Sequence, residues 1–183
     1  EKVYLITGAT SDVGYELIRT LNDGCSKFLL QGFGDGDALK ALCAENNIDA
    51  EYFEVNLSDS EETDRFVEAI SAYSPTHFVH LPALRVINTK FKNFDEERFL
   101  LDMNVQVMSA VKICKAVAPK MAKAKFGRIL FMATSYVLAN PPKNTAAYIM
   151  AKNSIVGLMK ALAADYVSNG ITVNAISPSM IET

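Results

Sequence analysis

The chain has 183 residues and a mass of 20.0 kDa; half of its residues are hydrophobic and 21% are charged. This length and composition are typical of one globular domain and exclude a disordered protein. The net charge of −3 and the pI near 5.4 argue against a nucleic-acid partner, because binding to phosphate backbones depends on a basic surface. The longest apolar runs, such as 129–133, are far shorter than the roughly 20 residues that span a bilayer, so we expect no membrane partner.

The three cysteines, Cys25, Cys43 and Cys114, lack the spacing of a metal site, and the chain opens without a basic and then apolar leader. An odd number of cysteines without such a leader is typical of a reducing compartment. We therefore expect a cytoplasmic protein without a metal.

Short β-branched runs alternate with segments of helical periodicity along the chain. In chain order, the elements that we predict are a strand at 2–7, a helix over 15–21, a strand at 28–31, a helix over 37–45, a strand at 50–56, a helix that begins at 59, a strand at 77–81, a long helix over 95–123, a strand at 128–133, a long helix over 147–168 and a strand at 171–176.

Six strands separated by helices predict right-handed βαβ crossovers. We therefore expect an α/β fold of the Rossmann-like kind: a doubly wound, mostly parallel sheet with helices on both faces. Several strands are apolar throughout, as strands buried on both faces are. No linker or repeat divides residues 1–183, and the Gly- and Asp-rich stretch 32–37 is a loop, so we expect a single domain.

The first strand leads directly into a glycine turn, TGATSDVG at 7–14, and a helix follows. A strand, a glycine turn and a helix N-terminus in this order can cradle a phosphate, because free backbone N–H groups and the positive end of the helix face one point. Gly8 permits the tight turn, and Gly14 permits close packing of the helix on the strand. The alternative is an ordinary turn that contains two glycines.

Tyr148 and Lys152 are four residues apart in a segment of helical periodicity, so both lie on one face of that helix. An ammonium group beside a phenol stabilises the phenolate and lowers the pKa of the hydroxyl toward neutral pH. Ser135, thirteen residues before Tyr148, follows the fifth strand, where its hydroxyl could orient a substrate carbonyl. Together these residues predict proton transfer to or from a carbonyl compound.

In combination, these motifs resemble the short-chain dehydrogenase/reductase family. Ser135, Tyr148 and Lys152 match its signature S-x12-Y-x3-K, and Asn104 matches its fourth catalytic residue. The thirteen-residue interval between Ser and Tyr is typical of the short form of the family. The segments GRIL, which begins at 127, and VNAISP, which ends at 178, resemble two further family motifs.

The chain departs from the family pattern in the turn and in the fourth strand. Asp12 and Ser11 stand where the short and extended forms have the middle glycine, and we expect Asp12 to turn away from the phosphate or to cap the helix. The family's N-N-A-G corresponds to the sequence HLPA at 80–83. We interpret His80 as a hydrogen-bonded residue that closes the strand rather than as a general base.

The hydroxyl that orients the substrate has two candidates. Counting forward from Gly127 points to Thr134, and counting back from Tyr148 points to Ser135. We favour Ser135, because its distance from Tyr148 fixes the hydroxyl at the carbonyl, whereas a strand end can absorb one extra residue.

The resemblance implies that NAD or NADP binds at the carboxyl ends of the strands and exchanges a hydride with the substrate. It further implies that Tyr148 transfers the proton, Lys152 holds the nicotinamide ribose, Ser135 holds the substrate oxygen and Asn104 anchors a water. The residues that it assigns to the cofactor are Gly8, Thr10, Ser11, Asp12, Val13, Gly14, Phe33, Asn56, Leu57, Leu81, Pro82, Ala83, Tyr148, Lys152, Pro178, Ser179, Ile181 and Thr183.

The choice between NAD and NADP stays open, because the segment QGF at 31–33 offers neither the acid nor the arginine that would select one. In overall pattern the chain most resembles the 3-oxoacyl-carrier-protein reductases, followed by sugar- or polyol-modifying members. We therefore expect a small-molecule or acyl-carrier-linked carbonyl substrate. The alternative from another class is a dinucleotide-binding regulatory protein without turnover.

The helices that carry Asn104 and Tyr148 are rich in apolar and small residues. The resemblance implies that they pair with a second copy in a homodimer or homotetramer; the alternative is that they face only their own sheet.

The family pattern continues beyond Thr183, so the resemblance also implies that 1–183 is the larger part of a longer dinucleotide-binding and catalytic domain.

Overall fold

The computed structural model describes residues 2–34 and 36–179. Six strands form one parallel sheet in the order β3-β2-β1-β4-β5-β6. Their bounds are β1 (Val3–Thr7), β2 (Lys27–Gly32), β3 (Asp49–Glu54), β4 (His77–His80), β5 (Gly127–Met132) and β6 (Ile171–Ile176). The strand order reverses between β1 and β4, which confirms the predicted doubly wound α/β fold.

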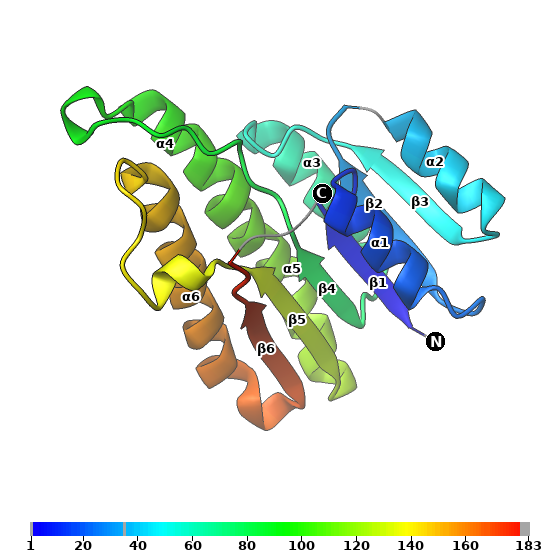
Figure 1. Ribbon diagram of the computed structural model, residues 1–183. Coiled ribbons are helices and arrows are strands. Elements are labelled where there is room, and N and C mark those ends of the chain that lie inside the picture. Colours follow the sequence, from blue (N-terminus) through cyan, green and yellow to red (C-terminus); the bar gives the residue numbers. More distant parts are fainter. Residues whose placement is uncertain (1, 35, 180–183) are drawn as a thin grey trace.

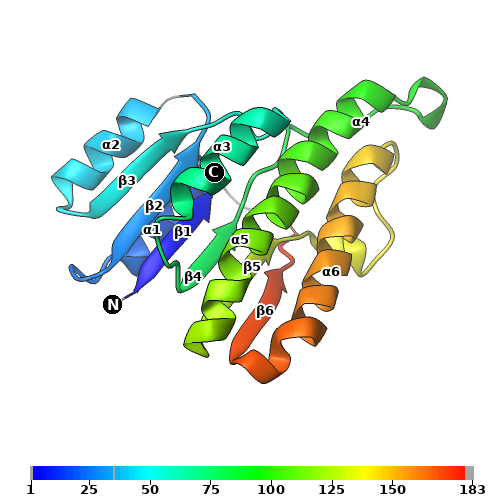
Figure 2. The ribbon, with the colours of Figure 1, turned by 180° about the vertical axis from the view of Figure 1, so that it is seen from behind.

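Helices cover both faces of this sheet. They are α1 (Asp12–Leu21), α2 (Gly36–Glu45), α3 (Ser60–Ile70), α4 (Glu96–Met103), α5 (Ser109–Ala124) and α6 (Ala146–Tyr166), with 3-10 turns at Phe91–Asn93, Ser135–Val137 and Val167–Asn169. Helices α1 and α2 lie on the face toward the viewer in Figure 1. The opposite view in Figure 2 shows α3, α5 and α6 on the other face. None of the helices described is both long and apolar enough to span a bilayer.

Successive residues of the central strands are buried on opposite faces. Leu5 of β1 and Leu29 of β2 belong to the core beneath α3, α5 and α6. Ile6 and Leu30 belong to the core beneath α1 and α2, and all four side chains are fully buried. The apolar character of these strands therefore reflects a sheet covered on both sides.

The predicted long helix over 95–123 is divided into α4 and α5 by a π-helical segment at Asn104–Met108. The backbone N–H of Ser109 donates to the carbonyl of Asn104, five residues earlier rather than four. The prediction of one uninterrupted helix was wrong here, because apolar periodicity does not reveal one extra residue in a turn. Such π turns are rare and are often found at functional sites.

Gly14 lies in the first turn of α1, where the helix passes over the end of the glycine turn. A Cβ atom on Gly14 would lie 2.4 Å from the carbonyl oxygen of Ala9, well inside van der Waals contact. A glycine is therefore needed here for close packing of the helix on the glycine turn; the close contact is with the turn, whereas the sequence predicted one with the strand.

We expect Gly14→Ala to lower the free energy of unfolding by about 1–3 kcal/mol, because the backbone must move to admit the methyl group. Gly157→Ala is the matched control. Gly157 also lies in a helix, but a Cβ there would meet no atom within 4 Å, and alanine is the better helix former. Urea unfolding followed by circular dichroism measures both; equal effects of the two substitutions would contradict the packing argument.

His80 ends β4 and joins three parts of the chain. Its Nε2 lies 2.8 Å from the carbonyl oxygen of Gln106 in the π-helical segment, and its Nδ1 lies 2.7 Å from the hydroxyl of Thr7 at the end of β1. Because a carbonyl only accepts, Nε2 donates to Gln106 and Nδ1 accepts from Thr7. Burial lowers the pKa of His80 to about 3, so the ring is neutral at pH 7. This confirms its interpretation as a hydrogen-bonded residue that closes the strand.

The lowered pKa of His80 makes folding stability depend on pH. The unfolded chain takes up a proton at His80 near pH 6.5, whereas the folded protein does so only near pH 3, so stability falls as the pH decreases through this window. The loss is up to about 1.4 kcal/mol per pH unit. We expect His80→Asn to flatten the dependence between pH 6.5 and pH 4.5 in urea unfolding more than His77→Asn does, because burial lowers the pKa of His77 as well but that ring is only half-buried. An unchanged slope in His80→Asn would show that this ring does not set the dependence.

Candidate functional site

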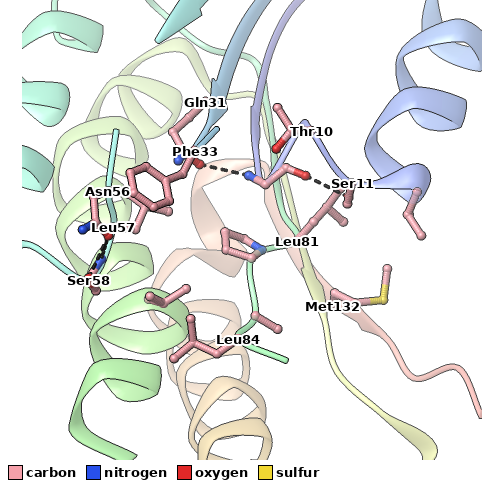
Figure 3. Close-up of a pocket in the computed structure, with 15 residues that line it drawn as sticks. Thr10, Ser11, Gln31, Phe33, Asn56, Leu57, Ser58, Leu81, Leu84 and Met132 are labelled. Atoms are coloured by element: carbon pink, nitrogen blue, oxygen red, sulfur yellow. Dashed lines mark hydrogen bonds between the residues drawn. The ribbon is translucent and has the colours of Figure 1, made fainter. Parts of the chain in front are cut away.

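A cavity of about 610 Å³ opens at the carboxyl ends of the strands, beside the glycine turn (Figure 3). It lies where the strand order reverses, which is the edge of a doubly wound sheet where ligands bind. Its wall consists of the glycine turn with the start of α1, the ends of β2 and β5, the segments that follow β2, β3 and β4, and the π-helical segment. The lining residues are Gly8, Thr10, Ser11, Val13, Gln31, Phe33, Asn56, Leu57, Ser58, Leu81, Pro82, Ala83, Leu84, Val105 and Met132.

Most residues that the sequence assigned to the cofactor line this cavity, but two from the glycine turn do not. Gly14 packs against the backbone of the turn, as described above. Asp12 is exposed in the first turn of α1 and does not line the cavity, although the resemblance assigned it to the cofactor. The helix is capped by Ser11 instead, whose Oγ accepts from the N–H of Gly14 at 3.1 Å.

Pro178 and Ser179 are likewise outside the wall of this cavity. The carbonyl oxygen of Pro178 accepts from the backbone N–H of Ser135 at 2.9 Å, so the segment after β6 is tied to the segment after β5. Ile181 and Thr183 lie outside the described residues, and their predicted contacts stay predictions.

The glycine turn packs closely on the segment after β4 at the edge of the cavity. Gly8 has a φ of +70°, and a Cβ there would lie 2.9 Å from the backbone nitrogen of Pro82. The hydroxyl of Ser11 donates to the carbonyl of Gly8 at 2.8 Å and closes the turn. The N-terminus of α1 follows at once, so a bare backbone and a positive helix end lie at the edge of the cavity. These features fit the phosphates of a dinucleotide, and the cavity is large enough for a sizeable ligand.

Gln31 is a wall residue that the sequence prediction missed. Its side chain is 2% exposed; Nε2 donates to the carbonyl of Val55 at 2.8 Å and Oε1 accepts from the N–H of Gly8 at 3.0 Å (Figure 3). Gln31 therefore holds the glycine turn against the segment after β3. One feature of the sequence could have indicated this role: Gln31 is a polar residue in an otherwise apolar strand, and a buried amide needs hydrogen-bond partners.

Asn56 shapes the wall after β3. Its Oδ1 accepts from the backbone N–H of Ser58 at 3.1 Å and from the Ser58 hydroxyl at 2.7 Å, so the chain turns there and β3 ends at Glu54, earlier than predicted. Phe33 and Asn56 lie on one side of the cavity and Met132 on the other (Figure 3).

Tyr148 and Lys152 lie one turn apart on α6, as predicted, with Nζ 5.8 Å from the centroid of the tyrosine ring. Lys152 is 3% exposed, and its ammonium donates to the carbonyl of Met132 at 2.8 Å. Burial lowers the pKa of Lys152 to about 8, and the negative charge of Asp102 partly opposes this effect. The helix thus holds a cation beside the tyrosine and against a strand end that lines the large cavity.

Tyr148 and Lys152, which the sequence assigned to the cofactor as well, do not line the large cavity. Tyr148 lines a second cavity, of about 50 Å³, between the segment after β4, helix α4 and the start of α6. The segment after β4 contributes to both cavities: Leu84 lines the first, and the next residue, Arg85, lines the second. The lining residues of the second cavity are Arg85, Val86, Ile87, Thr89, Phe94, Asp95, Arg98, Phe99, Asp102, Asn144, Ala146, Ala147 and Tyr148.

The two candidate hydroxyls after β5 differ in environment. Thr134 is 2% exposed, and its Oγ1 accepts from the N–H of Tyr136, which caps the short turn that follows. Ser135 is half-buried and is anchored through its backbone. Neither Thr134 nor Ser135 lines either of the two cavities.

Asn104 begins the π-helical segment, and its Nδ2 donates to the carbonyl of Ser58 at 3.3 Å. The amide therefore contacts the same segment after β3 that forms one wall of the large cavity. Its role as an anchor for a water near Lys152 stays a prediction.

The sequence and the fold were compared with known proteins. A D-beta-hydroxybutyrate dehydrogenase of Cupriavidus necator is 28% identical over 190 residues, which cover 100% of this chain and 71% of the relative. A 2-keto-3-deoxy-L-fuconate dehydrogenase of Xanthomonas campestris pv. campestris is 30% identical over 149 residues, covering 81% of this chain and 48% of the relative.

A crystal structure of an NAD+-bound xylitol dehydrogenase superposes with a TM-score of 0.87 at 24% identity, over 100% of this chain and 71% of that chain. It shows the same fold. Residues 2–183 match the family described as short chain dehydrogenase. Since this match extends through the glycine turn and both long helices, the protein belongs to the short-chain dehydrogenases, a family of NAD(P)-dependent oxidoreductases.

Proposed function

We propose that residues 1–183 form one domain that binds NAD or NADP in the large cavity and a small carbonyl compound or secondary alcohol beside Tyr148. The observation that carries this proposal is the buried ammonium of Lys152. It lies one turn from Tyr148 and contacts Met132 on the wall of the large cavity. A proton-transfer group and a nucleotide site are thereby brought together.

Tyr148 is the proposed proton donor during reduction and the proton acceptor during oxidation. The buried ammonium of Lys152, which lies 5.8 Å from the centroid of the tyrosine ring, is proposed to hold the nicotinamide ribose. With a pKa of about 8, Lys152 remains mostly protonated at pH 7. The nicotinamide, when bound, donates or accepts the hydride. The hydroxyl of Ser135 is proposed to hold the substrate oxygen, with Thr134 as the second candidate.

The relatives act on a hydroxy acid, a keto-deoxy sugar acid and a polyol, as their names state. We propose that the substrate of this protein is a small molecule of this kind. The 3-oxoacyl thioester suggested by the sequence pattern is the narrower alternative. The remaining alternative is a regulatory protein that binds the nucleotide without turnover. Nicotinamide absorbance, followed with a panel of ketones, distinguishes it from both enzymes, because it would show no turnover.

The three free cysteines support the proposal of a reducing, cytoplasmic location.

We expect Tyr148→Phe to lower kcat by about 10²- to 10⁴-fold, the usual contribution of a positioned acid or base, and to leave NADH binding unchanged. Nicotinamide absorbance measures turnover, and NADH fluorescence measures binding. Tyr166→Phe, at the far end of the same helix, is the control and retains activity.

In the same assay we expect Ser135→Ala to reduce kcat more than Thr134→Val does. Retained turnover in Tyr148→Phe would remove this residue from the mechanism. The reverse order of the two hydroxyl variants would assign the substrate oxygen to Thr134.

We also propose a homodimer or homotetramer built on the helices that carry Asn104 and Tyr148. Apolar side chains exposed on this part of the chain support it: Leu100, Leu101, Met108 and Met150. Light scattering at micromolar concentration should give at least twice the mass of one chain. A monomeric mass would overturn the proposal.

A further inference from the structure

Two arginines line the same small cavity as Tyr148. Arg85 follows Leu84, which lines the large cavity, and Arg98 lies on α4. Within the described part of the chain, no carboxylate forms an ion pair with either guanidinium. Two cations without an ion-pair partner therefore lie on the wall of the cavity that holds the proposed proton-transfer group.

The two carboxylates on the same wall are engaged elsewhere. Asp95 caps α4, where its Oδ1 accepts from the backbone N–H of Arg98 at 2.9 Å and its charge is stabilised by the helix N-terminus. Asp102 is 8% exposed, and its Oδ1 accepts from Nε2 of Gln106 at 2.7 Å and from the N–H of Leu84 at 3.4 Å. The negative charge of Asp102 also interacts with the buried ammonium of Lys152 and raises its pKa, against the effect of burial.

The position of Arg85 is fixed by its neighbours. One N–H of Arg98, at Nη2, donates to the carbonyl oxygen of Arg85 at 2.8 Å and ties the segment after β4 to α4. Farther along that segment, the N–H of Thr89 donates to the carbonyl of Asn144 at 2.9 Å, which ties it to the segment before α6. The guanidinium of Arg98 has further N–H groups for a ligand, and the side chain of Arg85 is exposed to one.

We propose that Arg85, assisted by Arg98, binds a carboxylate of the substrate, so that the substrate is a hydroxy acid or the corresponding keto acid. This inference rests on the proposed function, because it places the substrate at Tyr148. A guanidinium matches a carboxylate with two parallel hydrogen bonds, and a neutral polyol or a thioester would leave both cations unpaired.

The chemistry balances with the cofactor of the family. In oxidation, the carbinol carbon of the hydroxy acid gives a hydride to NAD+ or NADP+ and its hydroxyl proton passes to Tyr148, which leaves the keto acid. The carboxylate at Arg85 is unchanged and serves only to orient the molecule. Arg85 is thus a specificity-determining residue.

The test uses the full-length protein, NADH or NADPH, and a panel of 2-, 3- and 4-oxo acids of three to six carbons, each paired with its methyl ester. We expect the preferred acid to exceed its ester in kcat/KM by at least tenfold. We expect Arg85→Gln to lower kcat/KM for that acid by about 10- to 100-fold, mainly through KM, and to change the value for the ester by less than threefold. Arg85→Lys should recover part of the loss, and Lys92→Ala, an exposed cation outside this cavity, should change neither value.

Three results overturn the inference while leaving the proposed function intact: esters turned over as well as acids, equal losses for acid and ester in Arg85→Gln, or a loss that appears only with Lys92→Ala. Absence of turnover with every acid and every ester, and also with polyols, neutral ketones and a 3-oxoacyl thioester, together with normal NADH binding, instead overturns the proposed function, and the inference falls with it. Thermal unfolding of each variant confirms that losses in activity do not come from misfolding.

Discussion

The hydrogen bonds of neutral His80 are the constraint on which the geometry of the site depends. Thr7, which donates to one ring nitrogen, ends β1 and begins the glycine turn, and Gln106, which accepts from the other, lies in the π-helical segment. The ring thus joins the glycine turn to the helix that carries Asn104. Burial keeps it uncharged, so it can accept at Nδ1 and donate at Nε2 at the same time. A charged ring would lose the acceptor.

From Gln106 the same network continues toward the proposed proton-transfer group. The side chain of Gln106 donates to Asp102, and the charge of Asp102 partly offsets the cost of burying the ammonium of Lys152. Buried polar groups in such a chain stabilise one another, because each is costly without its partner. Hydrogen bonds thereby join the glycine turn to the π-helical segment and α4, and the charge of Asp102 links them electrostatically to Lys152 on α6.

The two cavities differ in chemical character. All residues that line the large cavity are uncharged, and the glycine turn brings bare backbone to its edge. The small cavity carries two arginines and two carboxylates together with Tyr148. The first suits a large ligand that is held through backbone groups and apolar contacts, and the second suits a small polar molecule that is held by charge. Lys152 links the helix of Tyr148 to the wall of the large cavity, since its ammonium donates to the carbonyl of Met132.

The sequence by itself determined the alternation of strands and helices, the glycine turn and the spacing of Tyr148 and Lys152, because each depends on residues close together in the chain. The π-helical segment, the bonds of Gln31 to Gly8 and Val55, and the exposure of Asp12 were decided by tertiary structure. So was the meeting of Arg85, Arg98 and Tyr148 at one cavity. These features depend on which strand ends and helices lie side by side, and local periodicity carries no information on contacts between residues far apart in the chain.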